Sequence, residues 1–255
     1  MLKFNRYKAI CCYDGSSFIG WQRQKEGESV QSAIERVLTR MHKKETKCVG
    51  SGRTDRGVNA LGQVFHFDSD LNIETDVFLK ALNAQIHKGI HIKSLEIVDD
   101  NFHSLLDATY KVYRYHICVG ENNPFHRHHI FYCDYNFDIN KLKQAASYFV
   151  GEHDFSSYNT NSFDEIPNQV RSIYKLDVET KDNNIYLTFV GSGFMRYMVR
   201  MIVGTLIEIS TKDLDPQLAK DYLEAKDKSL VSYMAKPQGL TLVEVGYKPF
   251  DNQNE

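Results

Sequence analysis

The chain has 255 residues, with 31 Lys and Arg against 33 Asp and Glu, a formal net charge of −2, and 42% hydrophobic residues. This balance excludes a protein whose whole surface attracts polyanions, so a nucleic-acid partner would need a local basic face. The composition is typical of a globular protein, and the length fits one large or two small domains. No stretch approaches the roughly 18 apolar residues of a membrane helix, which predicts a cytoplasmic location and no membrane partner.

The first half predicts a β-α-β-β-α-β order. Residues 7–14 are strand-like, and a loop with aromatic and basic residues follows at 15–24. Ser29 suits a helix N-cap, and the recurrence of apolar residues from Val30 to Met41 predicts an amphipathic helix. Strands then flank a turn at 51–60, followed by a helix near 76–87 and a strand at 90–98.

The second half opens with a predicted long strand at 109–119. A helix from Asp138 is expected to end at Gly151, and strands at 172–178 and 185–190 are joined by a hairpin through 181–184. A helix at 194–209, a short helix starting at Asp215-Pro216 and a strand at 240–247 complete the chain. The pattern predicts an α+β fold with mainly antiparallel sheet, as two ferredoxin-like halves that meet near 102–107.

The segment from Ser51 to Ala60 places Asp55 between two arginines in a glycine-bounded turn before a strand. Arg53 and Arg56 favour the ionised carboxylate, and the glycines allow tight backbone geometry. An ion pair that only pins a surface turn is the structural alternative. The other candidate groups therefore decide how the turn is interpreted.

The predicted helix at 194–209 is apolar on almost every side, which indicates burial, yet Arg196 and Arg200 interrupt it on one face. A buried arginine needs a partner. Glu208, two turns along the helix, and Asp55, from the other half, are both candidates. Spacing alone does not choose between them.

Tyr113 lies on the strand at 109–119 and suits stacking on a nucleobase, although a core tyrosine is the commoner role. Known cofactor motifs are missing: the glycines form neither a P-loop nor G-x-G-x-x-G. The histidines at 126, 128 and 129 lack further ligands at metal spacing, and the five cysteines contain no C-x-x-C pair, which predicts reduced thiols. One arginine-flanked aspartate, with no metal and no cofactor, is what the sequence supports.

Five ordered blocks resemble the TruA-type tRNA pseudouridine synthase family over nearly the whole chain. They are Tyr13–Gln22, Gly52–Val58, Phe102-His103 leading to Tyr113–Tyr115, Gly151–Phe155 and Met198–Gly204. The resemblance implies a pseudouridine synthase fold of two RRM-like halves, residues 1–105 with the catalytic Asp loop and 106–255 with the stacking Tyr and the buried Arg. It also implies a continuous central sheet covered by helices, with a cleft between the halves.

The resemblance implies an isomerase that converts uridine to pseudouridine at positions 38–40 of tRNA, without metal or cofactor, as a homodimer. Asp55 is then the catalytic aspartate, Arg53 its neighbour, Tyr113 the ring on the target base and Arg200 the cation paired with Asp55. Loop position and charge predict further contacts with RNA phosphates. These are made by Arg23, Arg56, Lys111 and Arg127.

Three departures from the family pattern concern the substrate. Asn59 replaces the usual histidine, Leu105 replaces the usual arginine, and Lys236-Pro237 varies a Pro-Pro element. Loss of the cation at 105 would weaken RNA binding, so an enzyme of the same family acting on another RNA, such as ribosomal RNA, is an alternative. A non-catalytic RNA-binding or folding protein, and a metal-dependent nuclease using Asp14 and Asp55, are the others.

Overall fold

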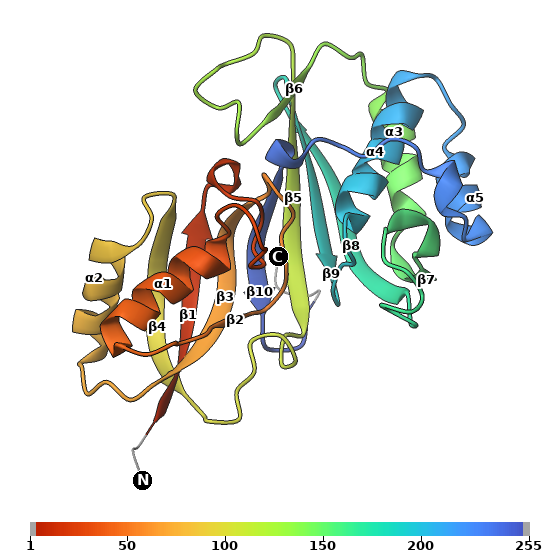
Figure 1. The fold of residues 1–255 in the computed structure, drawn as a ribbon. Helices are drawn as coiled ribbons and strands as arrows, with labels where there is room; N and C mark the ends of the chain where they lie inside the picture. Colours follow the sequence, from red (N-terminus) through yellow and green to blue (C-terminus); the bar gives the residue numbers. More distant parts are fainter. Residues whose placement is uncertain (1–3, 252–255) are drawn as a thin grey trace. The chain divides into compact units, whose positions relative to one another are not determined.

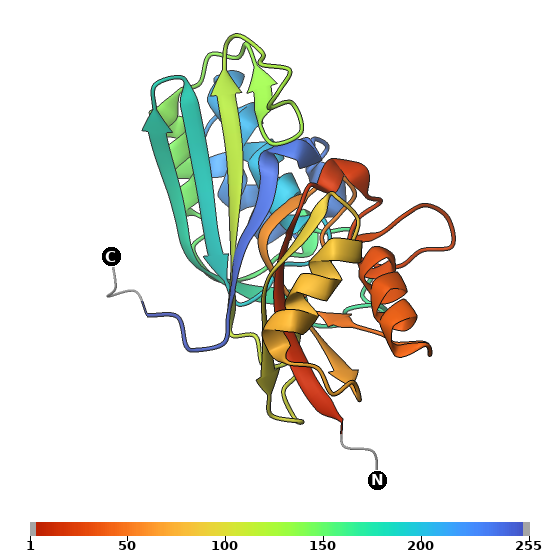
Figure 2. The ribbon, with the colours of Figure 1, turned by 90° about the vertical axis from the view of Figure 1, so that its left-hand side faces the viewer.

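The computed structural model describes residues 4–251, and the chain divides into two compact units. The first runs up to Thr109 and also includes the residues from Leu242 onward, whereas the second spans Tyr110–Thr241 (Figures 1 and 2). Both units combine antiparallel strands with helices, which confirms the α+β class. No helix among residues 4–251 is both long and apolar enough to cross a membrane.

The first unit follows the predicted β-α-β-β-α-β order. Its elements are β1 (Asn5–Tyr13), α1 (Val30–His42), β2 (Val49–Gly50), β3 (Asn59–Ser69), α2 (Thr75–Gln85), β4 (Ile90–Val98) and, from Leu242 onward, β10 (Leu240–Gly246). The strands are ordered β4-β1-β3-β10, with β2 on β3. The centre of β1 is paired on both sides, since Tyr7 lies opposite Phe67 of β3 and Ile97 of β4.

Helices α1 and α2 lie on one face of this sheet (Figure 2). Ser29 caps α1 as predicted, because its hydroxyl accepts the Ser32 N–H at 3.1 Å while Ser32 Oγ accepts the Ser29 N–H at 3.0 Å. Between sheet and helices, the Tyr7 ring stacks on Phe67 at 5.5 Å and meets the edge of Phe78 at 5.4 Å. Each such pair of rings stabilises the fold by about 0.5–1.5 kcal/mol, in addition to the stabilisation that comes from burying their apolar surface.

The second unit has a sheet ordered β5-β9-β8-β7, with β6 parallel to β5. Its elements are β5 (Tyr110–Val119), β6 (Phe131–Cys133), α3 (Ile139–Ser147), β7 (Gly151–Asp154), β8 (Val170–Lys181), β9 (Asn184–Gly191), α4 (Met198–Thr211) and α5 (Gln217–Ala225). Helices α3, α4 and α5 lie on one face of the sheet (Figure 1). The β8–β9 hairpin turns at Asp182 and Asn183, within the predicted segment.

Two predicted helix boundaries in this unit are wrong. Helix α3 ends at Ser147, and Gly151, expected as its C-cap, instead begins β7 with a φ of +113°. Helix α4 begins at Met198 rather than at residue 194, because Tyr197 has a φ of +65° that no right-handed helix can include. Arg196 therefore precedes the helix and is exposed, so it does not share a buried helical face with Arg200.

Candidate functional site

Asp55 lies in a loop of residues 51–58, called the Asp55 loop here, which connects β2 to β3 in the first unit. The Val58 N–H donates to the Asp55 carbonyl at 3.1 Å and closes a turn in which Gly57 has a φ of +79°. Asp55 is half-buried, whereas Arg53 and Arg56 are exposed. The loop thus presents one partly sheltered carboxylate with two cationic side chains on its solvent side.

The segment from Tyr13 to Trp21 holds the Asp55 loop at Thr54, the residue directly before Asp55. The Trp21 N–H donates to the Thr54 carbonyl at 3.1 Å, and the Tyr13 and Thr54 hydroxyls lie 2.8 Å apart. Gly20 has a φ of +108°, and a Cβ on it would lie 2.7 Å from the Thr54 carbonyl oxygen. A side chain at position 20 would therefore displace the loop.

Gln63 of β3 supports the same loop from inside the unit. It is fully buried, accepts a hydrogen bond from Ser51 Oγ at 2.8 Å and donates from Nε2 to the Gly52 carbonyl at 3.1 Å. Asn59, one of the three departures described in the sequence analysis, is also buried, and its Oδ1 accepts the Gly15 N–H at 2.9 Å. Asn59 thus ties the loop at 15–17 to the start of β3, and the departure has a structural role in this chain.

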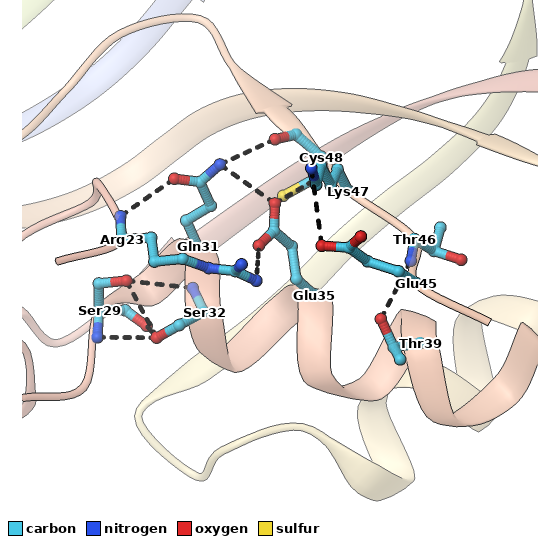
Figure 3. A network of polar contacts seen from close by, with 10 residues as sticks. All are labelled: Arg23, Ser29, Gln31, Ser32, Glu35, Thr39, Glu45, Thr46, Lys47 and Cys48. Atoms are coloured by element: carbon cyan, nitrogen blue, oxygen red, sulfur yellow. Dashed lines mark hydrogen bonds and ion pairs between the residues drawn. The ribbon is translucent and has the colours of Figure 1, made fainter. Parts of the chain in front are cut away.

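Arg23 forms an ion pair with Glu35, a buried carboxylate of α1 whose side chain is 3% exposed (Figure 3). The Glu35 Oε1 atom also accepts the Cys48 N–H and the Gln31 amide, each at 3.1 Å. Gln31 in turn accepts the Arg23 N–H at 3.1 Å and donates to the Cys48 carbonyl at 3.0 Å. Half of the Arg23 side chain is exposed, which leaves room for the predicted contact with an RNA phosphate. That contact stays a prediction.

In the second unit, Tyr113 is 7% exposed, and its ring meets the edge of Phe194 with 5.3 Å between the centroids. Lys111, two residues earlier on β5, is half-buried. Burial lowers its pKa to about 8, and the positive charge of Arg171 adds to the effect. Arg127 is exposed in the turn at 124–129, where it donates to the Pro124 carbonyl at 2.9 Å.

Arg200 is buried in α4 at 7% exposure, as expected. Its Nε donates to the Ala235 carbonyl at 2.8 Å, and its guanidinium carbon lies 5.4 Å from the centre of the Tyr197 ring. Glu208, one of its two candidate partners, pairs instead with Lys212 at 2.6 Å. The other predicted partner, Asp55, belongs to the first unit, and that pairing stays a prediction.

The close approach of α4 to the segment at 233–235 fixes where Arg200 lies. A Cβ on Gly204 would lie 2.0 Å from the Tyr233 carbonyl oxygen, so only glycine permits this approach. The Ala235 N–H donates back to the Arg200 carbonyl at 3.0 Å. Glycine within a helix costs about 1 kcal/mol relative to alanine, which this close packing offsets.

Sequence reasoning missed Tyr13, Thr54 and Gln63 as supports of the Asp55 loop. Tyr13 and Thr54 are 41 residues apart in the chain, so their spacing in the sequence does not reveal that the two hydroxyls are hydrogen-bonded. The available signal was a polar Gln63 directly before the apolar Val64 and Phe65, in the buried central part of β3. No group of three or more His, Cys, Asp or Glu side chains within residues 4–251 is placed to hold a metal ion.

Comparison with known proteins places the chain in a family. The model of a family described as tRNA pseudouridine synthase matches residues 9–107 and 145–248, so the chain belongs to this family of RNA-modifying isomerases. A tRNA pseudouridine synthase A from Exiguobacterium sp. is 41% identical over 246 residues, which cover 96% of this chain and 99% of that protein. One from Listeria monocytogenes serotype 4b is 40% identical, covering 95% and 99%.

The solved structures that match are more distant. A crystal structure of a Cbf5-Nop10-Gar1 complex aligns with a TM-score of 0.35 at 10% identity and covers 92% of this chain and 57% of that chain. The family assignment rests on the sequence comparisons alone.

Proposed function

We propose that this protein isomerises uridine to pseudouridine in tRNA, with Asp55 as the catalytic carboxylate. The family match over most of the chain and full-length relatives carrying that name support the activity. The observation that carries the residue assignment is the support of the Asp55 loop, where buried hydrogen bonds from Tyr13, Trp21 and Gln63 hold the residues beside a half-buried carboxylate. A positioned charged group of this kind is what a reaction without a cofactor needs.

The reaction breaks the C1′–N1 bond of the uridine, rotates the uracil and forms a C1′–C5 bond, while the C5 proton is lost and N1 gains one. Atoms and electrons balance within one nucleotide, so no co-substrate is consumed. Four roles fit an ionised Asp55: attack on C1′, attack on C6, action as a base, or stabilisation of an oxocarbenium-like sugar. Each of them requires the carboxylate to approach the base and sugar directly.

The other assigned residues act on the base and on the charge. Tyr113 stacks on the target base and offsets the few kcal/mol that leaving the helical stack costs. Arg200 pairs with Asp55 and keeps it ionised, while Arg53 holds it beside the substrate. Arg23, Arg56, Lys111 and Arg127 contact RNA phosphates.

Four finer statements complete the proposal. The target uridines are those at positions 38–40 of the tRNA, the enzyme works as a homodimer, and it works in the cytoplasm without a metal. Mapping of pseudouridines in total RNA from cells with and without the protein tests the first, and a target in ribosomal RNA would replace it. Sedimentation of the purified protein tests the second, and unchanged activity in excess chelator tests the absence of a metal.

The decisive experiment compares Asp55→Asn with Asp76→Asn, which removes the same charge from an exposed position in the first turn of α2. Each is incubated with an unmodified tRNA transcript, and pseudouridine is measured by mass spectrometry beside the binding affinity. Asp55→Asn should form no product while it still binds the RNA, and Asp76→Asn should match the unsubstituted protein. Product formation by Asp55→Asn at the full rate would reject the assignment of Asp55. If the unsubstituted protein formed no pseudouridine on any RNA, the alternative of a non-catalytic RNA-binding protein would stand instead.

A further inference from the structure

Lys111 and Arg171 lie on the same face of the second unit's sheet, on strands separated only by β9. Lys111 of β5 is opposite Gly191 of β9, and Gly191 is opposite Ile173 of β8. Arg171 comes two residues before Ile173 and therefore points to the same side of the sheet. The two cationic side chains thus border one position of β9 that has no side chain.

Aromatic rings lie against this position. A Cβ on Gly191 would lie 2.7 Å from the Ser172 carbonyl oxygen and 3.0 Å from Cζ of Phe194, whose ring contacts Tyr113. Tyr113 is two residues from Lys111 on the same face of β5, a separation of about 7 Å along the strand. One nucleotide can span that distance, with its base at Tyr113 and a phosphate at Lys111.

The charges of this pair are not balanced by acidic groups. Within the part of the chain that the structure describes, neither Lys111 nor Arg171 forms an ion pair, and Arg171 Nη1 donates only to the carbonyls of Asn168 and Val170, at 3.0 and 2.6 Å. Burial lowers the pKa of both side chains, for Lys111 to about 8. Two half-buried cations side by side destabilise the protein until an anion binds between them.

We propose that Lys111 and Arg171 together bind a backbone phosphate of the RNA, next to the nucleotide whose base stacks on Tyr113. The inference rests on the proposed function, and Arg171 is the new member of the site. The phosphate replaces the missing acidic partner, and its charge pairs with a lysine that is already largely desolvated. With its phosphate bound by this pair, the RNA strand lies where the neighbouring base can reach the Tyr113 ring.

The first test removes each charge and measures binding of an unmodified tRNA transcript at several salt concentrations. Lys111→Met and Arg171→Met should each weaken binding several-fold and reduce the slope of log K against log salt by roughly one unit. Lys181→Met is the matched control, since this exposed lysine lies at the opposite end of β8, and it should leave both quantities unchanged. Wild-type affinity and slope in both Lys111→Met and Arg171→Met would overturn the proposal.

Thermal unfolding separates binding from a structural role. Because Lys111→Met removes a desolvated charge beside Arg171, its midpoint should equal or exceed that of the unsubstituted protein while its RNA binding weakens. If the midpoint falls and binding per folded molecule is unchanged, Lys111 supports the fold and the proposal is wrong.

Proton uptake gives a second test that needs no destabilising variant. The charged group of this unit that acts on the pKa of Lys111 is Arg171 of β8, and His153 of β7 is paired in register with Arg171. Since the phosphate favours the charged ammonium, RNA affinity should fall up to tenfold per unit as the pH rises above 8. The Lys111→Arg side chain stays charged over this range, so the RNA affinity of that variant should change less with pH than the affinity of the unsubstituted protein. An equal pH dependence of the two proteins would contradict the proposal.

The outcomes also separate this inference from the proposed function. Pseudouridine formation at full rate by both Met variants, with unchanged KM, would reject the phosphate site and leave the isomerase intact. Absence of pseudouridine with the unsubstituted protein would reject the isomerase, and the salt and pH measurements would still test the phosphate site.

Discussion

The hydroxyl groups of Tyr13 and Thr54 lie 2.8 Å apart inside the first unit, and Thr54 directly precedes Asp55. Both side chains are buried, so the hydrogen bond is shielded from water. It connects the end of β1 to the Asp55 loop and restricts the direction in which the following carboxylate points.

Tyr13→Phe should therefore reduce turnover about tenfold or more while RNA affinity stays close to normal, since small displacements of a catalytic group have large effects on rate. It leaves the Thr54 hydroxyl without this partner and should cost about 1–3 kcal/mol of unfolding free energy. Adding Thr54→Val should recover part of that loss, which urea unfolding of the single and double variants measures. Strictly additive effects on stability would show that the hydrogen bond contributes nothing.

Gly20→Ala should displace the Asp55 loop. The new Cβ would lie 2.7 Å from the Thr54 carbonyl oxygen, and the positive φ is unfavourable for alanine, so we expect a loss of about 1–3 kcal/mol with reduced turnover. Gly193→Ala is the matched control, because no atom lies within 4 Å of its Cβ position. Chemical denaturation and initial rates measure both, and equal behaviour of the two variants would refute the clash.

Arg23→Met should destabilise the protein by about 1–3 kcal/mol, because it leaves the buried Glu35 carboxylate with neutral donors only. Arg36→Met breaks a comparable but exposed pair with Glu28 and should cost about 0–1 kcal/mol. Unfolding in urea compares the two. A smaller loss for Arg23→Met than for Arg36→Met would mean that the Glu35 network does not stabilise the first unit.

His66 should make stability depend on pH. Burial, with the charges of Arg6 and His103, lowers its pKa from 6.5 to about 4, and its Nδ1 accepts the Ser104 N–H at 3.1 Å. Between these two pKa values the unfolded chain binds a proton that the folded chain does not, so the unfolding free energy should fall by about 1–2 kcal/mol as the pH drops from 6.5 toward 4. His66→Asn should show a shallower decline between pH 6.5 and 5, and an identical decline would exclude His66 as its source.

The sequence predicted the regular elements well wherever local signals agree. Ser29 with the apolar series after it located the start of α1, and the predicted strand at 90–98 has the observed bounds of β4. Such elements are determined by residues within a few helical turns of one another, or by the alternation of apolar and polar residues along a strand. The α+β class followed from their order, and the family from motif blocks.

The start of α4 was predicted wrongly for a physical reason. Phe194 and Met195 continue the apolar character of the helix, but the backbone at Tyr197 takes a left-handed conformation that composition does not reveal. The supports of the Asp55 loop were missed because they depend on pairs far apart in the chain, such as Gly20 against Thr54. For the same reason the unbalanced charges of Lys111 and Arg171 became visible only once strand register was known.

The Glu35 network has a consequence for how the chain emerges from the ribosome. All of its partners lie between Arg23 and Cys48, with sequence separations of 12 and 13 residues from Glu35 to those two. Short separations close quickly, and nothing beyond Cys48 is needed to satisfy this carboxylate. A nascent chain can therefore neutralise the acidic group of α1 long before β10, the last strand of the first unit's sheet in chain order, has been synthesised.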